Sequence, residues 1–394
     1  MVMVSAVPRS IGEPNKKNMR TLLYGLGLIA LQACAPNASD EANPPNDANA
    51  QEPTSTLAKF EPEDGKCILF VGQELAAIGG LEEFNDGYLD HFERPGGFTM
   101  YTKIRPGDEE FGFTYDGLAG VFTTDDWGDG PSNMSRQIAD PDFEHMALAI
   151  GLELVNHEAK VADGTHDSLV IALGEWIKSL GQRPVFLRIG YEFGGAWNHY
   201  DRKQYVDAFK RIHHLYDSLE VENVAYVWQS HGWGMDQNVL ESWYPGDEYV
   251  DWCGYSFFSR FDEVEMIEFA RKRGKPVFIA EATATISTET VKTNGKTKET
   301  ILSNSNQATE AWDQWFEPFF QTIEENEDVV KAVSYINCHW KANRMWFDNP
   351  TFQNVDARLQ TSEMISAKWK SKVSDPRYIH ASPELYSRLW RTAP

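Results

Sequence analysis

The chain has 394 residues, a length that accommodates either two average domains or one large α/β barrel. Hydrophobic residues make up 42% of the sequence and charged residues 24%, proportions that exclude both a disordered polymer and a polytopic membrane protein. The 36 Lys and Arg residues against 59 Asp and Glu residues give a net charge of −23. A chain of this charge repels phosphate backbones, so nucleic acid is not expected as a partner.

The N-terminal segment has the pattern of an export signal. A basic stretch at 16–20 precedes an apolar run over 22–33, which is too short for a membrane span of ~20 residues. The tetrapeptide Leu-Gln-Ala-Cys at 31–34 resembles the bacterial lipobox, in which the cysteine receives lipid and becomes the mature N-terminus. We therefore predict a signal peptide over 1–33 and a lipid anchor on Cys34.

The residues that follow Cys34 are rich in Asn, Pro, Asp, Ala and Ser and cannot bury a core. We interpret 34–58 as a disordered linker between the lipid and a folded domain over 60–372, with 373–394 as an extension packed on that domain. The protein is expected to be exported and anchored to a bacterial membrane, with the outer membrane favoured and a periplasmic or surface-facing position left open.

Short apolar runs alternate with helical stretches from about residue 66 onward, which is the βα pattern of a parallel sheet. Helical periodicity is clearest in the stretches 169–180 and 205–219. Eight runs are candidate strands: 67–71, 120–123, 145–151, 184–190, 224–228, 250–254, 276–280 and 332–336. Eight alternating strands predict a single (β/α)8 TIM barrel.

No metal or cofactor motif is present: the sequence lacks a His-Glu-x-x-His motif, a Cys-x-x-Cys pair and a P-loop. Besides Cys34 the chain has three widely spaced cysteines, which permit at most one disulfide and are expected to be buried free thiols. We therefore expect no cofactor and no metal.

Two glutamates stand at the ends of predicted strands, where barrel enzymes carry their chemistry. Glu192 follows the fourth strand, and residue alternation places Arg188 and Glu192 on the same side of that strand. Glu281 holds the same position at the end of the seventh strand. Each carboxylate alone could be a structural partner of a neighbouring Arg, but the matched placement of both favours a catalytic pair.

In these residues the chain resembles the family 26 glycoside hydrolases, whose best-known members are β-mannanases, within the clan of retaining β-glycosidases. The resemblance runs from about residue 70 to residue 369. It rests on the segment 188–197 around Glu192, with its Arg, Gly and Trp, and on the segments 243–254 and 275–281. It implies that Glu192 is the acid/base and Glu281 the nucleophile. Arg188 is a candidate to keep Glu281 ionised through its charge.

The chain departs from the family pattern at two positions near the bond that is cut. Tyr191 stands where the family usually has His, immediately before the acid/base. Phe258, with Tyr255 nearby, stands where the family usually has an aromatic hydroxyl that hydrogen-bonds the nucleophile. These departures put mannan as the substrate in doubt and leave glycoside hydrolysis as the expected chemistry.

Aromatic and polar residues at other strand ends suit a sugar-binding cleft, although a core position is an equal alternative for any single Trp. Trp340 is assigned by the resemblance to the platform beneath the sugar at the −1 subsite, and His231 with Asn337 or His339 is expected to bond sugar hydroxyls. The expected substrate-binding residues are Arg188, Tyr191, Trp197, Trp228, His231, Trp233, Tyr255, Asn337 and Trp340.

The sequence thus predicts an endo-acting hydrolase of a β-linked polysaccharide, β-mannan or a related glycan. Alternative substrates are 1,3-linked β-xylan, β-glucan or an algal galactan. A second class of function is a non-catalytic glycan-binding lipoprotein on the same barrel. The presence of both glutamates favours the enzyme.

Overall fold

The computed structural model describes residues 57–258, 264–285, 300–302 and 305–390. Residues 55–394 form one compact unit. The predicted signal peptide, Cys34 and the linker up to residue 56 lie outside the described residues. Within the described ranges, no helix combines the length and the apolar character that a membrane span requires.

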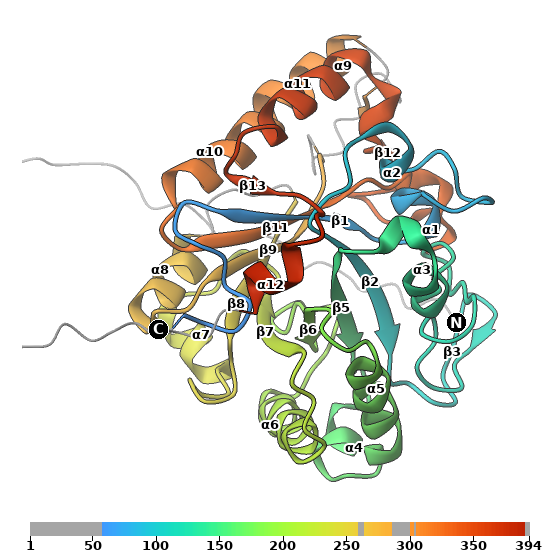
Figure 1. Ribbon diagram of the computed structural model, residues 1–394. Coiled ribbons are helices and arrows are strands. Elements are labelled where there is room, and N and C mark those ends of the chain that lie inside the picture. Colours follow the sequence, from blue (N-terminus) through green and yellow to red (C-terminus); the bar gives the residue numbers. More distant parts are fainter. Residues whose placement is uncertain (1–56, 259–263, 286–299, 303–304, 391–394) are drawn as a thin grey trace, which may run out of the picture. The chain divides into compact units, whose positions relative to one another are not determined.

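Eight parallel strands form a closed barrel, because the last of them, β11, pairs with the first, β1. Every residue of these strands is buried, as expected for strands between a packed interior and a helix layer. The strands are β1 Cys67–Gly72, β2 Gly97–Lys103, β5 Ala147–Glu153, β6 Val185–Ile189, β7 Val224–Ser230, β8 Trp252–Phe257, β9 Val277–Ala282 and β11 Val330–Ile336. The predicted (β/α)8 barrel is confirmed (Figure 1).

The second predicted strand, over 120–123, is wrong. These residues form a turn, and Gly120 has a φ of 76°, which a strand does not allow. The second barrel strand is β2, whose apolar residues alternate with Thr99, Tyr101 and Lys103. These side chains lie in the polar part of the barrel interior, where the Thr99 hydroxyl lies 2.8 Å from that of Ser334.

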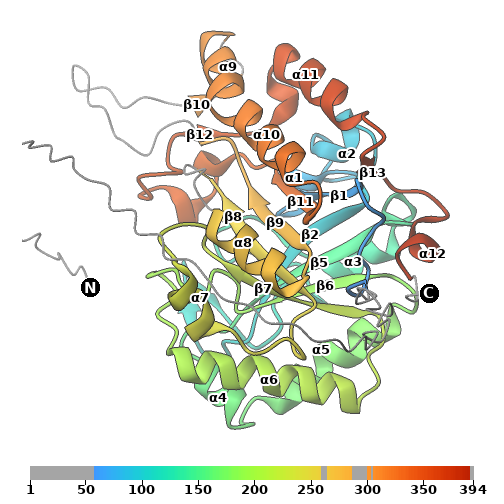
Figure 2. The same ribbon diagram turned by 90° about the vertical axis from the view of Figure 1, so that its left-hand side faces the viewer.

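Helices surround the barrel, with α5 and α6 on one side and α10 and α11 on the opposite side (Figures 1 and 2). The two stretches with the clearest helical periodicity are confirmed as α5 and α6, whose apolar residues face the strands. The helices are α1 Leu75–Ile78, α2 Tyr88–His91, α3 Met134–Ala139, α4 Glu158–Ala162, α5 Asp167–Ser179, α6 Arg202–Ser218, α7 Gln237–Trp243, α8 Val264–Arg273, α9 Ser305–Ala311, α10 Glu317–Glu325, α11 Glu363–Val373 and α12 Leu385–Leu389.

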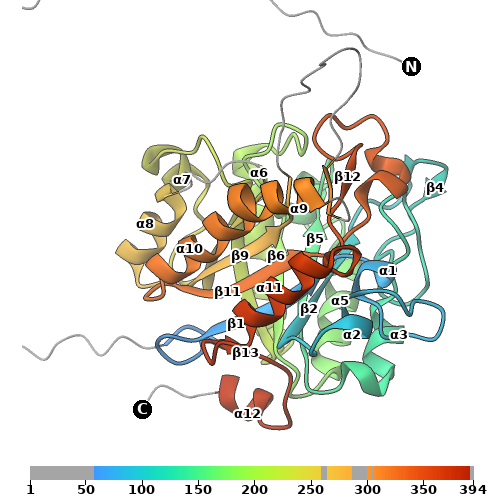
Figure 3. The ribbon, with the colours of Figure 1, turned by 90° about the horizontal axis from the view of Figure 1, so that it is seen from above.

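The C-terminal tail covers the amino ends of the barrel strands. Its strand β13, Tyr378–Ile379, pairs with the start of β1. Leu385 and Leu389 of α12 pack into an apolar cluster that includes Phe60 and the barrel-interior Phe186. Figure 3 shows α12 at one end of the barrel and β4 and β12 at the other. The carboxyl ends of the strands are therefore the end available for a functional site.

Two short strand pairs lie at the carboxyl ends of the barrel strands. The antiparallel pair β3 Glu109–Glu110 and β4 Phe113–Thr114 follows β2, and β10 Thr300–Ile301 pairs with β12 Val355–Asp356. The expected free thiols are confirmed, since the three cysteines of the described part are buried and unpaired: Cys67, Cys253 and Cys338.

Candidate active site

Glu281 lies in β9 and points into the open end of the barrel, with 6% of its surface exposed. Its Oε1 accepts hydrogen bonds from Arg188 Nη1 at 2.7 Å and from Gln229 Nε2 at 3.1 Å. The guanidinium of Arg188 is fully buried in the barrel. The contact is a buried ion pair, and it stabilises the ionised carboxylate of Glu281.

The guanidinium of Arg188 is also held by aromatic rings. Its Cζ lies 4.8 Å from the ring centre of Tyr101 and 5.3 Å from that of Tyr191. The two rings contact each other edge to face at 5.2 Å. Burial raises the pKa of both tyrosines well above the usual range, so they stay neutral and act as cation–π partners. The sequence did not point to Tyr101.

Glu192 is not oriented by strand alternation, as the sequence analysis predicted, but by a turn after the strand. Strand β6 ends at Ile189, so residue alternation no longer orients Glu192. Instead the chain turns through Gly190 and Glu192, whose φ values are 55° and 54°. A non-glycine residue with positive φ is unusual and marks a backbone held in place by its surroundings. After this turn, Glu192 lies near enough to Glu281 to be affected by its charge.

The Glu192 carboxyl is 8% exposed and accepts a hydrogen bond from Trp197 Nε1 at 2.9 Å. Its pKa is raised to about 8, chiefly by burial and then by the negative charge of Glu281. Burial is the larger of the two causes. A carboxyl that keeps its proton at neutral pH beside an ionised carboxylate is suited to general acid catalysis.

The sequence analysis missed two polar residues beside Glu281. Gln229 of β7 hydrogen-bonds Arg188, Glu281 and the hydroxyl of Ser256, and Ser256 of β8 is the cross-strand partner of Glu281. Residue alternation separates these side chains from their outward-facing neighbours, but it does not tell which of the two faces lies inside the barrel. Ser256, not the expected Phe258 or Tyr255, is the residue of this strand that enters the site.

An aromatic rim lies next to Glu192. It consists of Trp197, His231 and Trp233, with the imidazole 5.6 Å from the first indole and 4.8 Å from the second. The side chains of Trp197 and Trp233 are 50% and 40% exposed. Burial lowers the pKa of His231 to about 4, so its imidazole is neutral. Exposed indoles beside a polar group suit the stacking of a sugar ring.

Trp228 and Tyr255 are not in the cleft. Each precedes a residue that points into the barrel, so each points outward, against the helix layer. Trp228 is fully buried and stacks on Phe193 at 4.5 Å, and Tyr255 is 1% exposed within the same apolar core. Both residues were predicted to contact the substrate, and the structure places both in the core instead.

Trp340 and Asn337 also differ from expectation. Trp340 is 1% exposed and one face of its indole stacks on Phe352 at 4.3 Å, so it lacks the free face that a sugar platform needs. The amide of Asn337 is fully buried and bonds the backbone of Ala77 and Leu359. Both residues fix the loops after β1 and β11, while His339 lies 3.5 Å from Asp356.

Sequence reasoning also missed a polar group around Asp129. Gln73 Nε2 donates to both carboxylate oxygens at 2.8 Å, and Trp346 Nε1 donates to Oδ1 at 2.6 Å. Burial raises the pKa of Asp129 to about 7. The described residues contain no group of His, Cys, Asp or Glu side chains that could hold a metal ion.

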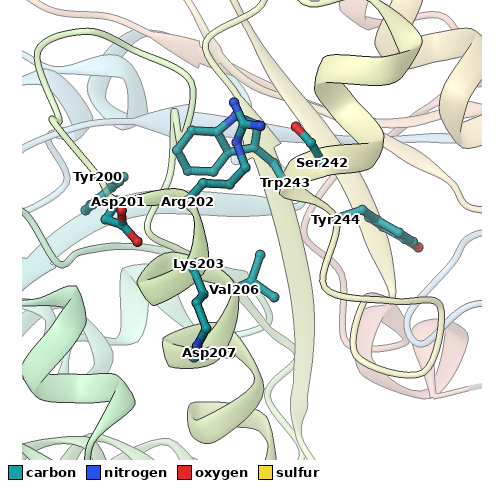
Figure 4. A pocket seen from close by; sticks show the side chains of 9 residues that line it. All are labelled: Tyr200, Asp201, Arg202, Lys203, Val206, Asp207, Ser242, Trp243 and Tyr244. Atoms are coloured by element: carbon teal, nitrogen blue, oxygen red, sulfur yellow. Dashed lines mark hydrogen bonds and ion pairs between the residues drawn. The ribbon is translucent and has the colours of Figure 1, made fainter.

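A cavity of about 660 Å³ lies apart from the two glutamates, between the start of α6 and the end of α7 (Figure 4). The guanidinium of Arg202 covers the ring of Trp243 there, 5.2 Å from its centre. Neither Glu192 nor Glu281 lines this cavity.

Two buried glutamates at the open end of a barrel, one with a raised pKa and one in an ion pair, are the pair of carboxyl groups that a glycoside hydrolase uses. The family model for glycosyl hydrolase family 26 matches residues 147–349, and the chain belongs to this family. The resemblance deduced from the segments around Glu192 and Glu281 is confirmed, and with it hydrolysis of a β-linked glycan.

Two curated relatives cover most of the chain. The β-1,3-xylanase TXYA of a Vibrio species is 30% identical over 352 residues, which are 84% of this chain and 69% of the relative. A β-1,3-xylanase of an Alcaligenes species is 29% identical over 345 residues, 83% of this chain and 68% of the relative. Among solved structures, the catalytic domain of a family 26 endo-β-1,4-mannanase from Bacillus sp. JAMB-750 shares the fold, with a TM-score of 0.52, 14% identity and coverage of 88% of this chain and 99% of that one.

Proposed function

We propose that this enzyme cleaves internal bonds of β-1,3-xylan with retention of configuration, with Glu192 as acid/base and Glu281 as nucleophile. The choice of β-1,3-xylan as substrate rests on one observation: more than four-fifths of the chain matches relatives named as β-1,3-xylanases. The similarity to the mannanase, at 14% identity, supports the fold alone, so β-1,3-xylan replaces β-mannan as the favoured substrate.

In the first half-reaction, the Glu281 carboxylate attacks the anomeric carbon while the glycosidic C–O bond breaks. Glu192 gives its proton to the departing oxygen, and a glycosyl ester with Glu281 remains. The proton on Glu192 at neutral pH and the ion pair of Glu281 with Arg188 support these roles.

In the second half-reaction, a water attacks the anomeric carbon of the ester. Glu192, now ionised, takes a proton from that water, and Glu281 leaves as a carboxylate. The two inversions give net retention. Trp197 and Trp233 on the Glu192 side of the opening would stack the sugars of the leaving chain.

The test incubates the barrel domain, starting before Phe60, with β-1,3-xylan, β-1,4-xylan, β-mannan, β-1,3-glucan and an algal galactan. We expect xylo-oligosaccharides of several sizes from β-1,3-xylan, with the β-anomer formed first in proton NMR spectra. Glu281→Gln, which keeps the size of the side chain, should remove the activity. Release of sugars from another polymer only, or activity that survives Glu281→Gln, would contradict the proposal.

We also propose that the chain is exported and anchored through lipid on Cys34, with 34–58 as the tether. The basic and apolar segments before Cys34 support this. In a Gram-negative host, the wild-type protein should sediment with membranes and carry lipid at Cys34 by mass spectrometry. Cys34→Ala should remove the lipid and shift the protein to the soluble fraction, whereas Cys67→Ala, in the barrel, should not. Equal membrane association of wild type and Cys34→Ala would refute the anchor.

A further inference from the structure

The side chain of Asp129 is held in place by residues from two other loops. Gln73 Nε2, directly after β1, donates to both carboxylate oxygens at 2.8 Å, and Trp346 Nε1, in the loop after β11, donates to Oδ1 at 2.6 Å. Asp129 itself lies in the segment between β2 and β5. All three residues follow the carboxyl ends of barrel strands, the end that also carries Glu192 and Glu281.

The backbone around Asp129 is fixed as well. Asn343 Nδ2 donates to the Asp129 carbonyl at 3.1 Å, and the amide of Met345 donates to the carbonyl of Gly128 at 2.8 Å. Gly128 and Gly130 have φ values of 102° and 99°, a conformation that larger residues rarely adopt. The carboxylate is therefore presented by an ordered loop, as a binding residue requires.

The Asp129 carboxylate forms no ion pair within the described residues. Both of its donors are neutral, and the ammonium of Lys103 pairs with Glu153 at 2.9 Å instead. An ionised carboxylate offers about four acceptor positions, and three are occupied here. Asp129 is half-buried, so part of the group remains open to a further donor. This remaining capacity suits a ligand that carries hydroxyl groups.

Aromatic packing connects the segment of Asp129 to the catalytic ion pair. Trp127, two residues before Asp129, is 2% exposed and packs in one cluster with Tyr101. The ring centre of Tyr101 lies 4.8 Å from the guanidinium of Arg188, which pairs with Glu281. Asp129 is thus part of the packed unit that surrounds the nucleophile. Burial, and to a smaller extent the charge of Glu281, raises the pKa of Asp129 to about 7.

The strand order places this group across the barrel from the aromatic rim. Around the closed barrel, three strands separate β1 from β7 in either direction, and three separate β11 from β6. Gln73 after β1 and Trp233 after β7 therefore stem from opposite strands, and so do Trp346 after β11 and Trp197 after β6. Since Trp197 bonds the acid/base, the rim side receives the leaving chain. The opposite side receives the sugars that stay bound to Glu281, here called the glycone side.

We propose that Asp129, oriented by Gln73 and Trp346, accepts a hydrogen bond from a hydroxyl of the sugar chain on the glycone side of the cleft. The ligand is a neutral β-linked oligosaccharide, and in 1,3-linked xylan each xylosyl residue keeps its hydroxyls at C2 and C4 free. The inference rests on the proposed function, because the roles of Glu192 and Glu281 define the glycone side. Asp129 then determines how tightly the chain is bound, not how its bond is broken.

The test measures binding of β-1,3-xylo-oligosaccharides to the inactive Glu281→Gln variant by calorimetric titration, at a pH above the pKa of Asp129. Adding Asp129→Asn, which keeps the size of the side chain and one acceptor oxygen, should weaken binding by about 10–100-fold, the range expected for a hydrogen bond to a charged group. The matched control is Asp125→Asn. Asp125 lies in the same segment, its carboxylate accepts from the Gly120 amide and the Thr123 hydroxyl, and its change should leave the dissociation constant unaltered.

Kinetics locate the contact. In an aryl β-1,3-xylobioside with an activated phenol, both sugars lie on the glycone side, so Asp129→Asn should lower kcat/KM on this substrate by the same factor as on β-1,3-xylan. A loss confined to the polysaccharide would contradict a glycone contact. A purely structural role would lower stability in urea without changing the dissociation constant. If Asp129→Asn does not fold, Trp346→Phe, which removes the N–H donor to Asp129, should weaken binding several-fold.

An unchanged dissociation constant in the folded Asp129→Asn protein would overturn this proposal, even where β-1,3-xylan is cleaved. If Glu281→Gln binds oligosaccharides of mannan or β-1,3-glucan instead, and Asp129→Asn weakens that binding, the substrate proposal fails and the role of Asp129 stands. Failure of Glu281→Gln to bind any of these oligosaccharides would refute both.

Discussion

Glu192→Gln is expected to lower kcat/KM on β-1,3-xylan by about 10²–10⁴-fold, because a sugar leaving group needs a proton that the amide cannot give. An aryl glycoside with an activated phenol as leaving group needs no proton, so formation of the glycosyl-enzyme should remain fast and the ester should accumulate. Azide, which attacks without a general base, should restore turnover of the aryl substrate. Steady-state and burst kinetics on both substrates measure these effects.

The pH profile gives an independent check. In the wild type, kcat/KM should fall as the pH rises through about 8, where Glu192 loses its proton. The same raised pKa means that the folded state holds this proton more tightly than the unfolded chain, so its contribution to stability is complete at low pH and is lost as the pH rises toward about 8. Glu192→Gln should lack both effects. Equal losses on both substrates, or an alkaline limb that persists in Glu192→Gln, would contradict the assignment.

Arg188→Met is expected to produce the largest combined loss of activity and stability. It leaves the buried carboxylate of Glu281 without its ion-pair partner, and breaking one side of a buried pair costs about 3–5 kcal/mol of folding free energy. The nucleophile also loses the group that positions it, so kcat/KM should fall at least about 10²-fold. Urea unfolding and kinetics of the purified variant measure the two effects.

A double variant separates charge from packing. Arg188→Met combined with Glu281→Gln removes both charges, so it should be more stable than Arg188→Met alone although it is inactive. Arg183→Met is the control. Arg183 is also buried, but it donates to the carbonyls of Phe143 and Met146 away from the site, and its loss should lower stability and spare activity. A double variant no more stable than Arg188→Met would show that the ion pair does not determine the loss.

The sequence predicted the barrel because each strand and helix carries its own periodicity. Those patterns are local, and they located Arg188, Glu192 and Glu281 near strand ends. They failed at β2, where polar residues such as Thr99 and Lys103 alternate with apolar ones because β2 faces the polar part of the barrel interior. A search for uniformly apolar runs selected the turn at Gly120 instead.

Sequence patterns alone thus predicted the fold class, the family and the two carboxylates. They did not show which neighbouring side chain of a strand enters the barrel, because a shift of one residue exchanges the two faces. In β7, the structure places Trp228 in the core and its neighbour Gln229 in the site. The protonation of Glu192 also depends on the tertiary structure, because burial and the charge of Glu281 raise its pKa. Glu281 is 89 positions further along the chain, and only folding brings the two residues near each other.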